Sequence, residues 1–165
     1  MIQNIKVLIE ALREELQHYG EMLALLDRQQ EYLIARAVTE VFQSISLIKA
    51  GGTALQQARD HRQKCHRVVA GDVGLEAEAN FGDLIPRLPA DYQPLMQALI
   101  EENNELLLGV RRRARQNHLM LRRSVELMQD LLNTLQPSRQ SSVYNETGAR
   151  QRAVAAPRQL YEAMG

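Results

Sequence analysis

The sequence has no tryptophan, and phenylalanine and tyrosine together make up only 4% of its residues. Aromatic side chains pack well on a pleated sheet, so their scarcity argues against an all-β fold. Leucine, alanine, glutamine, glutamate and arginine dominate instead, a composition typical of long helices that pack through narrow aliphatic seams. With 45% hydrophobic residues, a chain of 165 residues can bury one core but is too short for two ordinary domains.

No charge of one sign prevails, because twenty basic and twenty acidic side chains give a formal net charge of zero. Such a chain has no overall field that would attract nucleic acid or an anionic membrane. One local excess stands out, a run without acids that contains Arg111, Arg112, Arg113, Arg115, Arg122 and Arg123. Most of these arginines fall on outward heptad positions and no aromatic residues lie among them, so a solvated helix face is favoured over a nucleic-acid contact.

Long hydrophobic runs are absent, since nowhere do eighteen apolar residues follow one another. The first residues also lack a basic segment followed by a short apolar stretch, so we expect a cytoplasmic protein without membrane insertion. The single cysteine, Cys65, cannot form an internal disulfide, which agrees with a reducing compartment and leaves an intermolecular bridge open.

Signs of catalysis or of a bound metal are weak or missing. His61, Cys65 and His66 lie within about one and a half turns of a predicted helix, but two ligands on one face without a third or fourth rarely hold zinc. Pairs of acids such as Glu14-Glu15 are ordinary solubilising residues, and there is no glycine-rich phosphate loop, nucleophile elbow or triad. We therefore expect no catalytic residue, no metal and no cofactor.

Proline is absent before Pro86, so long uninterrupted helices can form in the first half of the chain. From Ile5 two sevenfold apolar series run together, which predicts a coiled-coil helix of about thirty residues. The first series is Ile5, Leu12, Tyr19, Leu26 and Leu33, and the second is Ile9, Leu16, Leu23, Gln30 and Ala37.

A second helix is predicted over residues 38 to 69, with Gly51-Gly52 in its middle. Its seam residues are Val38, Val41, Ile45, Ile48, Leu55, Ala58, Cys65 and Val69. Each glycine costs a helix interior about 1 kcal/mol relative to alanine, so the pair marks a kink, a break or a close helix crossing. A kinked but continuous helix is the favoured interpretation.

Glycines and prolines then cluster in residues 71 to 93, which predicts a connector with at most a short helix. Leu75, Phe81, Leu84 and Ile85 are expected to pin this connector to the bundle. A third long helix is predicted from near Asp91 to Leu135, before Pro137. Its sevenfold series is Ile100, Leu107, Ala114, Leu121, Met128 and Leu135, and the accompanying series Asn103, Val110, Asn117, Ser124 and Leu131 is half polar, as in register-specifying seams.

The predicted fold is therefore all-α, a long antiparallel three-helix coiled-coil bundle over residues 1–136. A short helical connector joins the second and third helices. Residues 137–165 begin with Pro-Ser-Arg-Gln-Ser-Ser and lack apolar periodicity, so we expect a flexible C-terminal tail.

The end of the third helix carries an apolar stripe wider than a seam requires. The stripe consists of Leu121, Val125, Leu127, Met128, Leu131, Leu132 and Leu135. Either the tail or the second helix folds back over these residues, or they are exposed. If exposed, the stripe would bind an amphipathic helix, with methionine adapting to imperfect shapes.

The pattern as a whole resembles the FlgN family of flagellar export chaperones. The resemblance rests on diffuse features, none of them a catalytic signature. They are the leading helix from Leu12-Arg13-Glu14-Glu15-Leu16 to Gln29-Gln30-Glu31, the end of the second helix from Arg59 to Gly71, Glu102-Asn103-Asn104-Glu105-Leu106-Leu107, and Tyr144-Asn145-Glu146-Thr147-Gly148, which is similar to a Tyr-x-x-x-Gly element after the last helix in this family.

The resemblance implies a cytoplasmic chaperone that binds the C-terminal helical regions of the hook-associated proteins FlgK and FlgL and keeps them unassembled. It also implies delivery of these clients to the flagellar type III export gate without ATP hydrolysis by the chaperone. The client-binding part of the family is the C-terminal helical region, which matches the stripe, and the tail element assigns docking at the gate to Tyr144. The alternative is a structural coiled-coil protein that self-associates through its C-terminal helix, which would also make the client-free protein a homo-oligomer.

Overall fold

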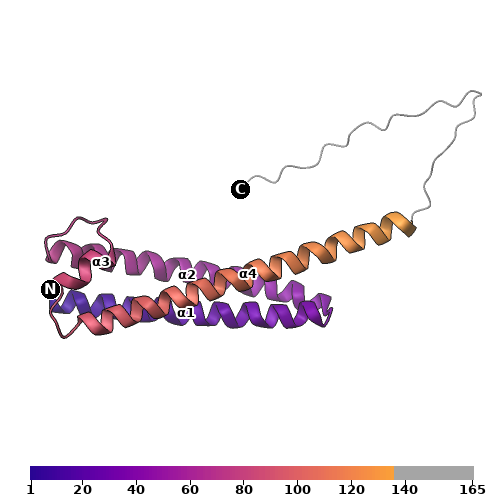
Figure 1. Cartoon of the computed structure of the whole chain (residues 1–165). Coiled ribbons are helices and arrows are strands. Elements are labelled where there is room, and N and C mark those ends of the chain that lie inside the picture. Colours follow the sequence, from indigo (N-terminus) through magenta and orange to yellow (C-terminus); the bar gives the residue numbers. More distant parts are fainter. Residues whose placement is uncertain (136–165) are drawn as a thin grey trace, which may run out of the picture. The chain divides into compact units, whose positions relative to one another are not determined.

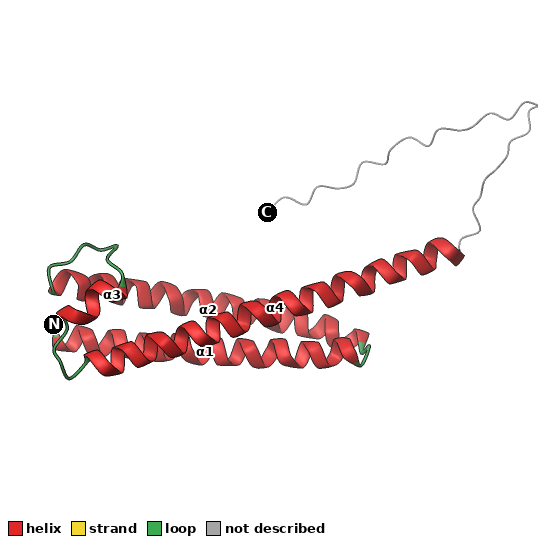
Figure 2. Cartoon of the chain, in the orientation of Figure 1, coloured by secondary structure: helices red, strands yellow, loops and turns green. Residues whose placement is uncertain are grey.

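The structure is a computed structural model that describes residues 1–135, and every regular element in that range is a helix (Figure 2). In chain order these elements are α1 (Ile2–Ile34), α2 (Val38–Asp72), α3 (Phe81–Leu84), the 3-10 turn η1 (Ile85–Arg87) and α4 (Gln93–Leu135). The predicted all-α class is confirmed, with three long helices and a short connector helix. The predicted tail, 137–165, and Tyr144 within it lie outside the described residues.

The chain divides into two units, Met1–Val125 and Glu126–Gly165. The first unit holds α1, α2, α3, η1 and α4 as far as Val125, and Glu126–Leu135 of the second unit are the last turns of α4. The expected boundary between a bundle of residues 1–136 and a tail stays a prediction.

α1 and α2 form an antiparallel hairpin and lie side by side (Figure 1). The Asn4 amide donates to Asp72 across one end, and the Gln29 amide donates to Ser44 across the other. The turn between the helices is closed by Arg36 in a left-handed conformation, φ 55°, and by a hydrogen bond from the Ala37 N–H to the Tyr32 carbonyl. This is the Schellman arrangement that commonly ends helices, here with arginine where glycine is usual.

α1 is the central helix of the first unit, because it contacts both α2 and α4. The first predicted series is buried from Ile5 through Leu26, and in the second series Ile9 is buried while Leu16, Leu23 and Gln30 are half-buried. A third sevenfold series is also buried, and the sequence analysis missed it. Its members are Leu8, Glu15, Met22 and Gln29. A helix with two neighbours buries three positions of each heptad, whereas a two-stranded seam needs only two.

α2 is continuous through Gly51-Gly52, so a break at the glycines is wrong and the close helix crossing is what the structure shows. A Cβ atom on Gly51 would lie 3.2 Å from the Met22 Cε and 3.3 Å from a Leu25 methyl carbon. The missing side chain at Gly51 therefore lets α1 and α2 approach each other closely.

Two predicted seam residues of α2 are wrong, since Val38 is 60% exposed and Ile45 44% exposed. The face that α2 turns toward α1 runs through Ser44 and Gly51 instead. Ile45 follows Ser44 directly and is rotated from that face by about 100°. Small residues form the contact here, and a search for regularly spaced apolar residues does not identify them.

The apolar core lies at the end of the bundle where the connector meets the long helices. Connector residues Leu84 and Leu88 are buried there together with Ile5, Leu8, Ile9, Leu12, Val69, Met96 and Leu99. The expectation for the connector is confirmed, because Leu75, Phe81 and Ile85 pack against this cluster and Leu84 is completely buried. Each fully buried aliphatic side chain of this kind contributes about 1.5–3 kcal/mol.

α4 runs parallel to α1, and two buried asparagines fix its register. The Asn103 amide nitrogen donates to the Leu12 carbonyl at 3.1 Å, and the Asn117 amide nitrogen donates to the Leu26 carbonyl at 2.7 Å. Each acceptor lies 91 residues before its donor, so the two contacts repeat one another two heptads apart. This confirms that the half-polar series of α4 faces inward at these two positions.

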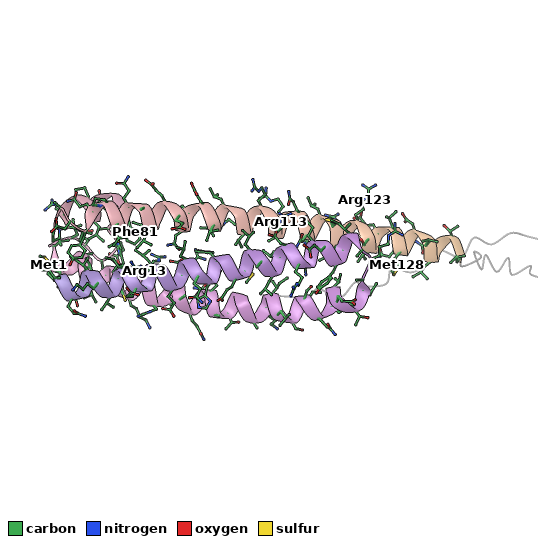
Figure 3. The ribbon with its side chains drawn as sticks, turned by 90° about the horizontal axis from the view of Figure 1, so that it is seen from below. Met1, Arg13, Phe81, Arg113, Arg123 and Met128 are labelled. Carbon is green, nitrogen blue, oxygen red and sulfur yellow. The ribbon has the colours of Figure 1, made fainter. Side chains whose placement is uncertain are left out.

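The other predicted α4 series is only partly correct. Ile100, Leu107 and Leu121 are half-buried, and Ala114 is exposed. This part of α4 is held to α1 by longer polar side chains. One of them, Arg113, lies on the side of α4 toward α1 (Figure 3), where its Nε pairs with Asp27 at 2.6 Å and its Nη1 contacts Gln30.

The buried Asn117 amide gives a first prediction. Asn117 is 1% exposed and also donates to the Gln29 side-chain oxygen at 3.1 Å, so an aspartate there would place a carboxylate against two acceptors. Asn117→Asp should lower the free energy of unfolding by about 2–4 kcal/mol, measured by urea denaturation at pH 7. Asn104→Asp, at an exposed position of the same helix, is the matched control and should change it by less than about 0.5 kcal/mol. Equal losses in both variants would contradict this role of Asn117.

Candidate functional site

The predicted apolar stripe is exposed in the structure except at its first residue. Leu121 is half-buried, and the exposed fractions of Val125, Leu127, Met128, Leu131, Leu132 and Leu135 range from 54% to 71%. Figure 3 shows the side chains of this part of α4, with Met128 labelled. Contiguous apolar surface of this kind usually marks an interaction site in a soluble protein.

The last turns of α4 are clearly amphipathic. At 100° per residue the stripe residues spread over roughly 160° of the helix circumference. Glu126, Gln129 and Asp130 fall on the opposite side. A helix with this division is suited to pack its apolar side against another helix.

A second surface feature is a groove of about 330 Å³ in the first unit, which borders α1, α2 and α4. Its walls carry apolar side chains from α1, α4 and the connector, and two arginines of α2. The residues that line it are Leu12, Glu15, Tyr19, Arg59, Arg62, Phe81, Ile100, Asn103, Asn104 and Leu107. The sequence analysis did not identify this groove.

Glu15 organises the polar side of the groove. It is 4% exposed and meets Arg62 at 2.6 Å and Arg59 at 3.5 Å, while the Tyr19 hydroxyl donates to it at 3.1 Å. Burial and the neighbouring Glu15 charge both raise the pKa of Tyr19, so the phenol stays protonated and remains a donor. A signal for this cluster was present in the sequence, because Glu15 shares a sevenfold series with Leu8 and Met22.

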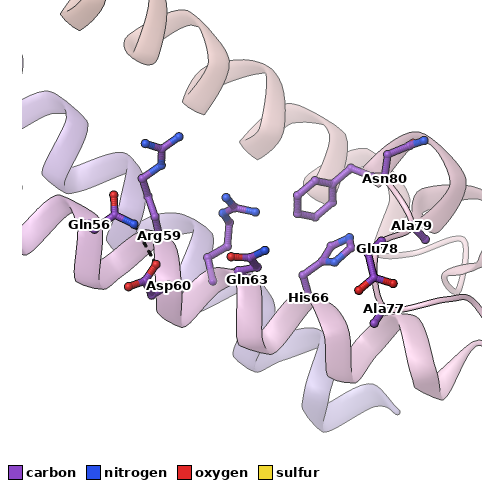
Figure 4. Close-up of a pocket in the computed structure, with 11 residues that line it drawn as sticks. Gln56, Arg59, Asp60, Gln63, His66, Ala77, Glu78, Ala79 and Asn80 are labelled. Carbon is purple, nitrogen blue, oxygen red and sulfur yellow. Dashed lines mark hydrogen bonds between the residues drawn. The ribbon is translucent and has the colours of Figure 1, made fainter.

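Arg62 also links the groove to a neighbouring pocket of about 460 Å³ between α2 and the connector (Figure 4). Its guanidinium lies 5.8 Å from the centre of the Phe81 ring, and His66 packs edge-on against the same ring at 4.5 Å. Asp60 and Glu78 border this pocket, so its charges are mixed. Nothing in this set of side chains has the geometry of a catalytic centre, and we assign it a structural role.

The three candidate metal ligands have separate surroundings. His61 is exposed and contacts Glu14, Cys65 packs beside the apolar core, and His66 lies against Phe81. Burial raises the pKa of the Cys65 thiol, which disfavours the reactive thiolate. Within residues 1–135, no three histidine, cysteine, aspartate or glutamate side chains are grouped so that they could hold a metal ion.

The prediction that most of the arginine run lies on a solvated face of α4 is confirmed. Arg111, Arg112, Arg115, Arg122 and Arg123 are exposed. Arg113 is the exception, because its pairing with Asp27 joins α4 to α1. In the part of the chain that the structure describes, none of the helices is both long and apolar enough to span a membrane. The absence of nucleic-acid partners stays a prediction.

Comparison with known protein families identifies a match. The chain matches the family described as FlgN protein over residues 1–152. Searches of the curated proteins and of the solved structures each found no match. The family match covers all the described helices and reaches into the residues beyond them.

The surroundings of His66 predict how stability changes with pH. Burial, with the charges of Arg62 and Arg67, lowers the pKa of His66 below its ordinary value of 6.5. As the pH falls, the imidazole of His66 is therefore protonated in the unfolded chain before it is protonated in the folded protein. The contribution of neutral His66 to the free energy of unfolding is complete above about pH 6.5 and is lost as the pH falls through the folded pKa. Acids such as Asp72, whose pKa is lowered mainly by the Asn4 hydrogen bond, change the free energy of unfolding at lower pH.

His66→Leu should flatten the pH dependence of the free energy of unfolding just below pH 6.5, measured by urea denaturation at closely spaced pH values. Gln63→Leu is the control, because it places the same leucine at an exposed, non-titrating position of the same helix, and it should keep the wild-type slope. An unchanged slope in His66→Leu would show that another group is responsible.

Proposed function

The chain belongs to the FlgN family of flagellar export chaperones, and from this we propose that it binds the C-terminal helical regions of the hook-associated proteins FlgK and FlgL. In this proposal the chaperone keeps its clients unassembled in the cytoplasm and delivers them to the flagellar type III export gate. FlgN is a chaperone family and not an enzyme family, and the proposed role requires no chemical step.

The exposed stripe on α4 is the observation that carries this proposal. Leu131 and Leu132 are 60% and 56% exposed, so they are available to a partner at no cost to the core. A client helix that covered the stripe would remove its leucines and Met128 from water, at about 25 cal/mol for each Å² of apolar surface. Methionine can adjust to more than one client, since its side chain is unbranched and flexible.

The double variant Leu131→Glu, Leu132→Lys tests the stripe. Because both side chains are exposed, the variant should keep its helical content and its free energy of unfolding within about 0.5 kcal/mol. Binding to FlgK or FlgL, measured by light scattering and calorimetry, should fall by at least about a hundredfold, since desolvated central contacts dominate helix-in-groove interfaces.

The variant Arg122→Glu, Arg123→Gln changes charge on α4 outside the apolar stripe and serves as the matched control, with client affinity expected within about threefold. Loss of folding in the leucine variant would place these residues in a core. A stable self-oligomer that binds no client would favour the structural coiled-coil alternative.

Tyr144 lies outside the described residues, and its role rests on the family resemblance of the tail element. We propose that it contacts the export gate. Tyr144→Ala should leave client affinity unchanged and weaken co-purification with the export gate. Equal loss of both interactions would contradict this division between helix and tail.

A further inference from the structure

Arg59 and Arg62 bring two positive charges to the groove, whereas one acid, Glu15, pairs with them among residues 1–135. Both arginines reach Glu15 through their Nε atoms, at 3.5 Å and 2.6 Å. Among residues 1–135, Glu15 is the one acceptor that pairs with either guanidinium. Figure 4 shows Arg59 rising from α2 with its guanidinium away from Asp60. Two cations thus share one buried carboxylate, which cannot use all the donors of two guanidinium forks.

Such forks suit a carboxylate, because a planar guanidinium donates two parallel hydrogen bonds to its oxygens. Around the arginines the groove is apolar, with Leu12, Ile100, Leu107 and Phe81 among its lining residues. A free anion would leave these apolar walls without a partner. An amphipathic helix with an acidic side chain at the edge of its apolar face would satisfy both parts of the groove.

The groove also shares a helix face with the beginning of the stripe. Ile100 and Leu107 line the groove, and the same sevenfold series continues through Ala114 to Leu121, the first stripe residue. Positions seven residues apart lie nearly above one another on a helix. A helix that covers Leu121 can therefore continue along this face of α4 toward Arg59 and Arg62.

The chain's own stripe does not fit this description. Its acids, Glu126 and Asp130, lie on the side of α4 opposite the apolar residues. Packing the stripe of a second copy into the groove would direct these carboxylates away from Arg59 and Arg62. The charge pattern therefore favours a different protein as the occupant.

We propose that an acidic amphipathic helix of the export client occupies the groove between α2 and α4, where its carboxylate pairs with Arg59 and Arg62. This inference rests on the proposed function and adds a second, electrostatic contact to the apolar stripe.

Arg59→Gln tests the electrostatic contact. Arg59 is the more exposed arginine of the pair, and Glu15 keeps its closer partner Arg62, so the fold should be retained. Client affinity, measured by calorimetry with full-length chaperone and full-length FlgK or FlgL, should fall about tenfold at low salt. The salt dependence of binding should also become weaker. Arg59→Lys should recover only part of the affinity, since ammonium lacks the planar fork.

Arg67→Gln is the matched control, because Arg67 is exposed on α2 and does not line the groove, and it should change affinity less than about twofold. A photo-crosslinking amino acid in place of Asn104, which lines the groove, should capture the client. The same amino acid in place of the exposed Lys64 should not.

The outcomes separate this inference from the proposed function. If the Leu131 and Leu132 variant loses the client while Arg59→Gln and the Asn104 crosslink show no effect, the client uses only the stripe and the groove proposal is wrong. If the wild type binds no client, both proposals fail. A self-oligomer that Arg59→Gln dissociates would place a second copy in the groove and would overturn the choice of occupant.

Discussion

The arrangement of the first unit depends on two side-chain amides that reach a backbone carbonyl of a neighbouring helix. Asn103 and Asn117 make the same contact with α1 two heptads apart, at Leu12 and Leu26. An apolar seam would tolerate a shift of α4 by one heptad with little loss, whereas a shift here would separate both amides from their partners and bury them beside side chains of the wrong kind. The two asparagines therefore specify where along α1 the other α4 residues of the first unit lie.

Polar layers explain why the bundle can contain an open groove. α1 alternates along one series between apolar Leu8 and Met22 and polar Glu15 and Gln29, and each polar residue pairs with α2 or α4. Long polar side chains span a wider gap than interlocked leucines. Around Glu15 that gap forms the groove, lined partly by arginine and asparagine. A tightly packed aliphatic core at the same place would leave no room for a partner helix.

Sequence reasoning predicted the helices well and their contacts less well. The sevenfold series of α1, the connector residues Leu84 and Phe81, and the amphipathic end of α4 follow from spacing alone, because burial of apolar surface dominates there. The contacts of α2 did not follow, since its inward face uses Ser44 and Gly51 where Ile45 was expected. The groove was missed because charged residues are assigned to the surface by default, although the sevenfold series that Glu15 shares with Leu8 and Met22 indicates its burial.

Attachment through polar side chains also makes the stability of the first unit uneven. α1 and α2 cross closely at Gly51, so separating them would expose interlocked apolar surface and require the whole unit to unfold. Releasing α4 beyond Asn103 would mainly exchange amide and guanidinium hydrogen bonds for hydrogen bonds to water, which costs far less. We therefore expect the unit to behave as two cooperative segments, a durable hairpin and the part of α4 beyond Asn103, which should open at lower free energy. Partners that need to enter between them can use that opening without denaturing the protein.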